Sequence, residues 1–330
     1  MLSLPHKIDV NSQNRKIIKQ LGLHIESNRY LRHLSVIGVT GIKGAEFIAK
    51  GIAVSASLTS IDLSDNRLGP EGGKCVAEGI AVSASLTNID LPENLIGGEG
   101  AKHIAESVAV SASLTSINLF DNHIGEEGAK YVAEGISVST SLTSIDLSMN
   151  RLCDEGAKHI SEGIAVSALL TSIDLGYNKI GAEGAKHIAK GITVSASLKS
   201  IDLSFNNLTD HGKEMSGVKA IAKAISVNAS LTSINLMRNY IGNEGAKHIA
   251  KGIAVSASLT SVDVGHNDIG KEMVLNVFAI LKKKQMVSVG LAGCNFDADD
   301  AQAVADYISV SASLTSIDLS MNRLCDEGAK

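Results

Sequence analysis

The sequence contains no tryptophan and only three prolines, and aromatic residues make up 3% of its 330 positions. Hydrophobic residues nevertheless account for 44% of the chain. A core built from this material must be packed with small aliphatic side chains. A chain of this length is expected to form about two ordinary globular domains. A repeat array is an exception, because its core extends with each added repeat.

Concentrated charge and long apolar runs are also missing. The 30 basic and 35 acidic residues give a net charge of -5, and the longest basic run is Lys282–Lys284. Nucleic-acid-binding proteins carry basic patches, so we do not expect a nucleic-acid partner. No 18-residue apolar run occurs, and Met1–Val10 lacks the apolar stretch of a signal peptide. We therefore predict a cytoplasmic protein that does not contact membranes.

The cysteines are few and scattered. Cys75, Cys153, Cys294 and Cys325 do not form the clustered pairs that cross-link extracellular repeat proteins or ligate zinc. We interpret them as thiols in a reducing compartment and predict no metal and no other cofactor. Outside the repeating pattern, the sequence offers no combination of nucleophile, base and orienting group. We therefore predict that the protein is not an enzyme and has no small-molecule substrate.

The sequence repeats itself with a period of 28 residues. Leu-Thr-Ser-Ile-Asp-Leu or a close variant begins at Leu58, Leu86, Leu114, Leu142, Leu170, Leu198, Leu231, Leu259 and Leu314, with divergent copies at Leu31 and Met286. Self-similarity at a fixed period of this length is typical of solenoids. One step, from Leu198 to Leu231, is 33 residues long because five residues are inserted between Gly212 and Val218. The insertion is either a tolerated loop extension or a bulge that contacts a partner.

Each repeat predicts one strand and one helix. In residues 86–113, Ile89 and Leu91 alternate with polar residues at period two, and residues 100–110 carry apolar residues at helical spacing. Asn94 and its equivalents follow the strand, where we expect a ladder of side-chain amides that satisfies backbone groups of the turn. Glycine recurs in mid-helix, for example at Gly79 and Gly135, which predicts a close approach of neighbouring helices.

Stacked copies of this unit predict an α/β solenoid. Strands about 4.8 Å apart form a parallel sheet, and helices about 8 to 10 Å apart cover its other side, so the stack must curve into a horseshoe with the sheet on the concave face and the helices on the convex face.

The consensus L-x-x-[IL]-x-L-x-x-[NC]-x-[IL]-x-x-E-G-A-K-x-[IV]-A-x-G-[IV] covers nearly the whole chain. It resembles the ribonuclease-inhibitor type of leucine-rich repeat and is most similar to the NOD3-like group of the NLR family. The resemblance implies recognition of a protein ligand. Unlike NLR proteins, the sequence contains no G-x-x-x-x-G-K-[ST] nucleotide-binding motif, and the nearest run is Gly69–Cys75.

The two ends of the chain differ from the repeats between them. We predict that residues 1–30 form an N-terminal capping half-repeat, in which Ile18, Leu21 and Ile25 face the core. Residues 31–330 form one continuous array of about ten repeats. The last repeat is truncated, because Ser313–Lys330 copies Ser141–Lys158 without a difference and stops before a closing helix. We expect either a truncated gene model or a fragment of a longer array.

Variation between the repeats concentrates where the chain leaves each strand. The first, second and fourth positions after the second strand leucine differ from copy to copy, and we call these positions the exit band. Aromatic, methionine and arginine side chains gather there, and these types are enriched at interface hot spots. Drift at solvent-facing positions is the alternative explanation. The candidate partner-binding residues in the exit band are Phe120, Met149, Arg151, Tyr177, Phe205, Met237, Arg238 and Tyr240.

An aspartate recurs in the middle of most strands. Carboxylates on neighbouring strands repel one another, which a solvated face tolerates and which would attract a basic partner. Both interpretations stay open, and we include Asp146, Asp174 and Asp202 among the candidate partner-binding residues.

These patterns predict a protein–protein interaction scaffold that binds a partner on the concave face. A GTPase activator resembling the activator of the Ran GTPase is the alternative function. A nonfunctional product of repeat expansion is a third possibility, since the copies are nearly identical.

Overall fold

The computed structural model describes residues 7–11, 19–21, 23, 25, 28–38 and 41–324. The chain divides into two compact units. The first comprises Met1–Leu152 and Glu162–Asp174, and the second comprises Cys153–Ser161 and Leu175–Lys330.

The first unit is a parallel sheet with helices on one side. Each described strand pairs in parallel with the next along the chain. The strands are β1 (Lys7–Asn11), β2 (His33–Ile37), β3 (Ser60–Asp62), β4 (Asn88–Asp90), β5 (Ser116–Asn118), β6 (Ser144–Asp146) and β7 (Ser172–Asp174). The helices are α2 (Ile42–Val54), α3 (Gly69–Val82), α4 (Gly97–Val110) and α5 (Gly125–Val138), and α6 (Cys153–Val166) contains the boundary between the units.

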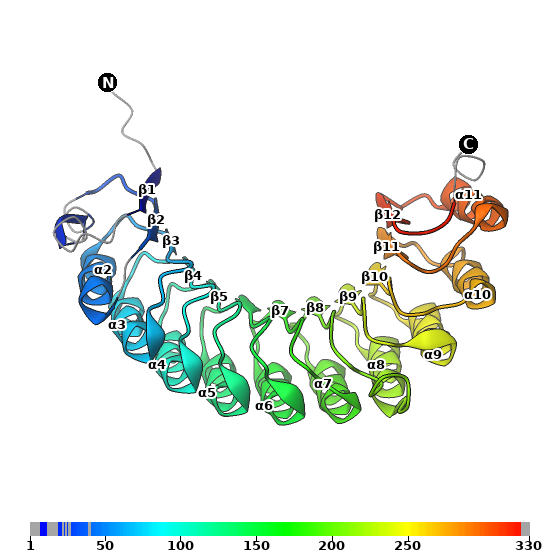
Figure 1. Cartoon of the computed structure of the whole chain (residues 1–330), viewed down its shortest axis with the longest axis horizontal. Helices are drawn as coiled ribbons and strands as arrows, with labels where there is room; N and C mark the ends of the chain where they lie inside the picture. The colour runs from blue at the N-terminus through cyan, green and yellow to red at the C-terminus, as the bar shows by residue number, and fades with distance from the viewer. Residues whose placement is uncertain are drawn as a thin grey trace, which may run out of the picture. The chain divides into compact units, whose positions relative to one another are not determined.

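The second unit repeats this arrangement, again with each described strand parallel to the next. Its strands are β8 (Ser200–Asp202), β9 (Ser233–Asn235), β10 (Ser261–Asp263), β11 (Ser288–Gly290) and β12 (Ser316–Asp318). Its helices are α7 (Ala182–Val194), α8 (Ser216–Val227), α9 (Gly242–Val255), α10 (Lys271–Leu281), the 3-10 turn η1 (Ala298–Asp300) and α11 (Ala301–Val310). Within each unit the strands lie along the inner, concave side and the helices along the outer side (Figure 1). The predicted α/β solenoid with one strand and one helix per repeat is confirmed.

Asparagine side chains form the predicted ladder behind the strands. The Asn94 amide nitrogen donates to the carbonyl oxygens of Leu63 and Leu91 at 2.8 and 3.0 Å. Its Oδ1 accepts the backbone N–H of Asn66, one repeat earlier, at 3.1 Å. Asn94 is fully buried, as are most of its equivalents. The ladder therefore satisfies backbone groups of two repeats at once and fixes the turn that leaves each strand.

Small residues let neighbouring helices approach closely. A Cβ atom placed on Gly135 of α5 would lie 2.8 Å from the carbonyl oxygen of Ala105 in α4. Gly163 of α6 has the same relation to Ala133 of α5, at 2.9 Å. The close approach predicted from the recurring glycine is confirmed.

The N-terminal prediction is incomplete. Leu21 and Ile25 are buried as expected, whereas Ile18 lies outside the described residues. Residues 1–30 also contain a strand that the sequence analysis missed, since β1 pairs with β2 in the register Ile8↔Leu34. The division at residues 30 and 31 stays a prediction. The truncated end of the last repeat, residues 325–330, also lies outside the described part.

The five inserted residues lengthen the connection that precedes α8. Strands β8 and β9 keep the common register, with Ser200 opposite Ser233, so the extra length is confined to the connection between Leu208 and Ser216. The hydroxyl of the buried Thr209 donates to the carbonyl oxygen of Tyr240 at 3.0 Å, which ties this connection to the next repeat.

Candidate functional site

The exit band is shaped by a left-handed backbone. Its second and fourth positions lie on either side of the ladder asparagine and adopt positive φ in most repeats, for example 55° at Tyr177 and 56° at Tyr240, whereas Asn207 and Arg323 do not. Such conformations are unfavourable for side chains other than glycine and asparagine. Most repeats keep this conformation although the residues at these positions differ, and Tyr177 and Tyr240 keep 45% and 47% of their surface exposed.

In the second unit the exit band forms a stack from three successive repeats. The rings of Tyr177 and Phe205 lie with centroids 3.9 Å apart and planes 15° apart. The Arg238 guanidinium carbon lies 4.9 Å from the centroid of the same Phe205 ring. The Phe205 ring therefore contacts an aromatic ring and a cation, and both kinds of contact are favourable.

A second contact joins the insertion to the exit band. His211 lies in the lengthened connection, and its ring meets the ring of Tyr240 edge to face with centroids 4.9 Å apart. Sequence reasoning did not single out His211, because a spacing of 33 residues does not show where the extra residues fold. Its position just before the insertion was the only signal available.

The exit-band residues Tyr177, Phe205, Arg238 and Tyr240 line an open hollow of about 470 Å³ in the second unit. Residues of the exit band in five successive repeats, from Tyr177 to Gly293, contribute to it. It has both apolar and charged lining, which suits recognition of a polypeptide more than of an apolar small molecule. The side chains around it include Tyr177, Phe205, Arg238, Tyr240, His266 and Asp268.

The remaining exit-band candidates are not part of this hollow. Met237 is half-buried in the second unit. In the first unit Phe120 is half-buried, while Met149 and Arg151 are exposed and adopt positive φ. The structure thus brings together four of the eight predicted exit-band residues: Tyr177, Phe205, Arg238 and Tyr240.

The strand aspartates have a structural role that the sequence analysis did not foresee. The Asp146 carboxylate accepts the backbone N–H of Ser148 at 2.8 Å, and Asp202 accepts that of Ser204 at 2.7 Å. A carboxylate that accepts a backbone N–H two residues later stabilises the turn. Asp174 is half-buried at the end of β7. Turn stabilisation therefore explains much of the recurrence of aspartate in the strands. A role of these aspartates in partner binding stays a prediction.

Two of the recurring strand aspartates, Asp90 and Asp263, are poorly solvated. Burial, together with the charge of Asp62 on the neighbouring strand, raises the pKa of Asp90. Pro92 occupies the position two residues later and has no N–H to donate, and Asp90 accepts from the Asn88 side chain at 3.0 Å. Burial likewise raises the pKa of Asp263, with smaller contributions from the charges of Asp318 and Asp202.

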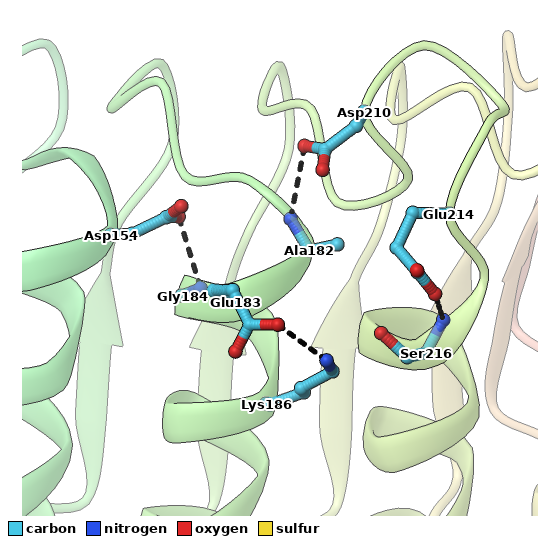
Figure 2. A network of polar contacts seen from close by, with 8 residues as sticks. All are labelled: Asp154, Ala182, Glu183, Gly184, Lys186, Asp210, Glu214 and Ser216. Carbon is cyan, nitrogen blue, oxygen red and sulfur yellow. Dashed lines mark hydrogen bonds and ion pairs between the residues drawn. The ribbon is translucent and has the colours of Figure 1, made fainter.

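A network of polar contacts joins the start of α7 to Asp154 at the start of α6 and to Asp210 in the connection before α8 (Figure 2). The Asp154 carboxylate accepts the backbone N–H groups of Gly181 and Gly184 at 2.6 and 3.0 Å. Asp210, from the lengthened connection, accepts the N–H of Ala182 at 3.2 Å. Carboxylates at a helix N-terminus satisfy unpaired donors and interact favourably with the helix dipole. The network therefore anchors the connection that carries His211.

The described residues contain no group of three or more histidine, cysteine, aspartate or glutamate side chains placed to hold a metal ion. None of the helices in the described ranges is long and apolar enough to cross a membrane.

The family comparison decides the class of the chain. A family model described as "Leucine Rich repeat" matches residues 54–77, 110–133, 138–161, 166–189, 194–214, 227–250, 255–272 and 310–330, more than half of the sequence. The chain belongs to the leucine-rich-repeat family. Members of this family carry a strand leucine pattern and a turn asparagine, here visible as the buried strand residues and the ladder.

Solved structures with the same fold are distant in sequence. A TLR13–ssRNA13 complex aligns with a TM-score of 0.51 at 20% identity, over 90% of this chain and 37% of that chain. An internalin, InlF from Listeria monocytogenes, gives 0.48 at 16% identity over 92% and 78%. Actin-binding site 2 of leiomodin-1 gives 0.39 at 17% identity over 48% and 90%. At such identities the TLR13 similarity reflects the fold alone. Among curated protein sequences, none matches this chain.

Proposed function

We propose that this leucine-rich-repeat protein is a protein–protein interaction scaffold that binds its partner at the exit band of the second unit. The observation that carries the proposal is the stack of Tyr177, Phe205 and Arg238 beside an open hollow. Tyrosine and arginine are the residue types that contribute most to binding energy at protein interfaces. Here they are held by backbone that the ladder fixes, so less conformational entropy is lost on binding.

Drift of unrestrained surface residues accounts for these side chains less well. Left-handed positions disfavour bulky side chains, and drift at such positions would favour asparagine and glycine. Instead, Tyr177, Phe205 and Arg238 occupy the same left-handed position in three successive repeats and contact one another. Their mutual contacts support selection for a surface.

Several finer features belong to the same proposal. We propose that the repeats are of the ribonuclease-inhibitor type and NOD3-like, which the 14-residue helices α3 and α9 support. We propose a cytoplasmic location, since Cys75 and Cys294 form no disulfide. Burial raises the pKa of the Cys294 thiol to about 12, so this cysteine is not a reactive thiolate at neutral pH. We propose that the protein acts by binding and not by catalysis.

The experiment compares affinity capture by wild type and by a Tyr177→Asn, Phe205→Asn, Tyr240→Asn variant. Asparagine tolerates the left-handed backbone, so the variant removes the rings without new strain. Captured proteins from a lysate of the organism that encodes the chain are quantified by mass spectrometry. We expect at least one protein to be captured by wild type and lost with the variant.

A matched control removes an aromatic ring elsewhere. Tyr131 lies on α5 in the first unit, half-buried beneath Lys102 at 5.4 Å, and Tyr131→Asn should leave capture unchanged. Circular dichroism must be the same for all forms. If the exit-band variant retains every captured protein, or wild type captures none, the exit band of the second unit is not the binding surface.

A further inference from the structure

We propose that the hollow in the second unit binds the side-chain carboxylate of an aspartate or glutamate in an extended segment of the partner, with Arg238 as its principal ligand. This inference rests on the proposed function and specifies the chemistry of the partner. It follows from the state of Arg238, from the other charged group in the hollow and from the length of the hollow.

Arg238 is held in place but not neutralised. It is exposed, and in the part of the chain that the structure describes its guanidinium forms no ion pair. One face of the guanidinium is occupied by the Phe205 ring at 4.9 Å. Stacking on a ring leaves the N–H groups at the edge of the guanidinium available, and two of them match the two oxygens of a carboxylate. Arg238 is therefore prepared for a planar, singly charged anion.

Asp268 distinguishes a carboxylate from a phosphate. Its side chain lines the same hollow, and it forms no ion pair within the described residues. A phosphorylated side chain carries close to two negative charges at neutral pH and would be repelled by this second carboxylate. A single carboxylate bound to Arg238 suffers less repulsion. Tyr240 and His266, whose side chains can form hydrogen bonds, also line the hollow.

The length of the hollow favours a segment that passes through it over a chain terminus. From Tyr177 to Gly293 the lining residues belong to five successive repeats, which at about 4.8 Å per strand step is roughly 19 Å. About six extended residues span this length at about 3.3 Å each. A terminal carboxylate would use only one end of it. The exposed face of Tyr177 then offers a contact for an apolar or aromatic neighbour of the acidic residue.

The test uses a phage-displayed library of random linear peptides selected on the full chain. We expect enrichment of sequences that combine an acidic with an apolar or aromatic residue. A selected peptide is then synthesised in three forms, with its acidic residue retained, replaced by the corresponding amide, or replaced by phosphotyrosine. Each form is titrated against wild type, Arg238→Gln and Lys223→Gln. Lys223 is exposed on α8 and controls for the loss of one positive charge.

The carboxylate contact predicts a specific pattern of affinities. Arg238→Gln and the amide peptide should each weaken binding about tenfold or more, and combining them should weaken it little further, because both remove the same contact. Lys223→Gln should have no effect, and the phosphotyrosine peptide should bind more weakly than the acidic one. Arg238 is exposed, so its replacement leaves the fold intact, which circular dichroism verifies.

Other outcomes separate this inference from the proposed function. If a selected peptide is lost with Tyr177→Asn but binds Arg238→Gln as well as wild type, the exit band binds polypeptide and the carboxylate contact is wrong. Tighter binding of the phosphotyrosine peptide would also overturn the inference, in favour of a phosphate. If no peptide is enriched, or none depends on Tyr177 or Arg238, both the inference and the surface on which it rests are contradicted.

Discussion

A Cβ atom placed on Gly79 of α3 would lie 2.7 Å from the backbone carbonyl oxygen of Ala49 in α2. The atom that blocks it belongs to the main chain of a helix and cannot rotate away. Alanine at this position would therefore separate two helices that the ladder and the sheet hold together. Its higher helix propensity, about 1 kcal/mol, offsets only part of this strain.

We predict that Gly79→Ala lowers the free energy of unfolding by up to about 2 kcal/mol, from overpacking of about 1 to 3 kcal/mol less a propensity gain of about 1 kcal/mol. Urea unfolding followed by circular dichroism measures the change. Ser107→Ala is the control, since α4 already accommodates a side chain at the equivalent position. A gain in stability of about 1 kcal/mol, the propensity gain alone, would show that the helices separate without strain.

The ladder predicts a larger loss at Asn94. Its side chain accepts the N–H of Asn66 and donates to Leu63 and Leu91, all in the buried interior. Asn94→Ala leaves the buried N–H groups of Asn66 and Leu68 without an acceptor, whereas Leu63 and Leu91 still accept from Asn66 and Asn122. Each buried unsatisfied group costs about 1 to 3 kcal/mol, so we predict a destabilisation of at least about 2 kcal/mol, measured by urea unfolding.

Asn88 provides the control for the ladder. It is a half-buried strand residue at a position where most repeats carry serine, as at Ser60 and Ser116. Asn88→Ser removes one partly buried hydrogen bond, from the Asn88 amide to Asp90 at 3.0 Å, and should cost no more than about 1.5 kcal/mol. A small effect at Asn94 as well would mean that water replaces the amide, and the ladder would then contribute little to stability.

The left-handed backbone of the exit band predicts a gain in stability at Met149. This residue is 37% exposed and has a φ of 57°, so its side chain adds strain with little burial in return. Met149→Asn should raise the free energy of unfolding by up to about 1 kcal/mol, because asparagine tolerates this conformation. Met237→Asn is the comparison, since Met237 is half-buried and its φ is not positive. A gain at Met237 but not at Met149 would contradict the argument from strain.

The sequence predicted the features that repeat and missed those that occur once. The strand alternation around Ile89 and the spacing of Gly79 and Asn94 recur at a fixed period, so each copy reinforces the same interpretation. The stack of Tyr177 on Phe205 could not be derived in this way. Both residues occupy the same position in successive repeats, so they were expected on neighbouring strands. The left-handed backbone and the rotamers that bring the rings together are properties of the folded turn.

The role of the strand aspartates was also only partly predictable from the sequence. Alternation placed Asp202 on the solvated face of its strand, but not its hydrogen bond to the N–H of Ser204, because that bond depends on the turn after the strand. The contact of His211 with Tyr240 could not be predicted either, because the inserted residues that follow His211 have no equivalent in the other repeats and change the path of the connection.

The raised pKa of Asp90 predicts how stability changes with pH. A carboxyl whose pKa is higher in the folded than in the unfolded state favours folding when protonated, below its unfolded pKa of about 3.9. That contribution is lost as the pH rises through the raised value, so at neutral pH the ionised Asp90 destabilises the protein. Asp90→Asn removes this destabilisation, because the asparagine side chain does not ionise. Asparagine could also donate to Asp62 on the preceding strand, as Asn235 donates to Asp202 at 2.7 Å.

We therefore expect Asp90→Asn to be more stable than wild type at pH 7, and the charge-dependent part of this difference shrinks as the pH falls through the raised folded pKa and is lost below about 3.9. Urea unfolding at a series of pH values measures it. Asp318→Asn should show the opposite trend, because the backbone N–H of Ser320 holds the pKa of Asp318 below its ordinary value. Its carboxylate stabilises the fold above the unfolded pKa and loses this effect as the pH falls. A constant difference between Asp90→Asn and wild type at all pH values would mean that burial does not perturb Asp90, and that any gain comes from the hydrogen bond alone.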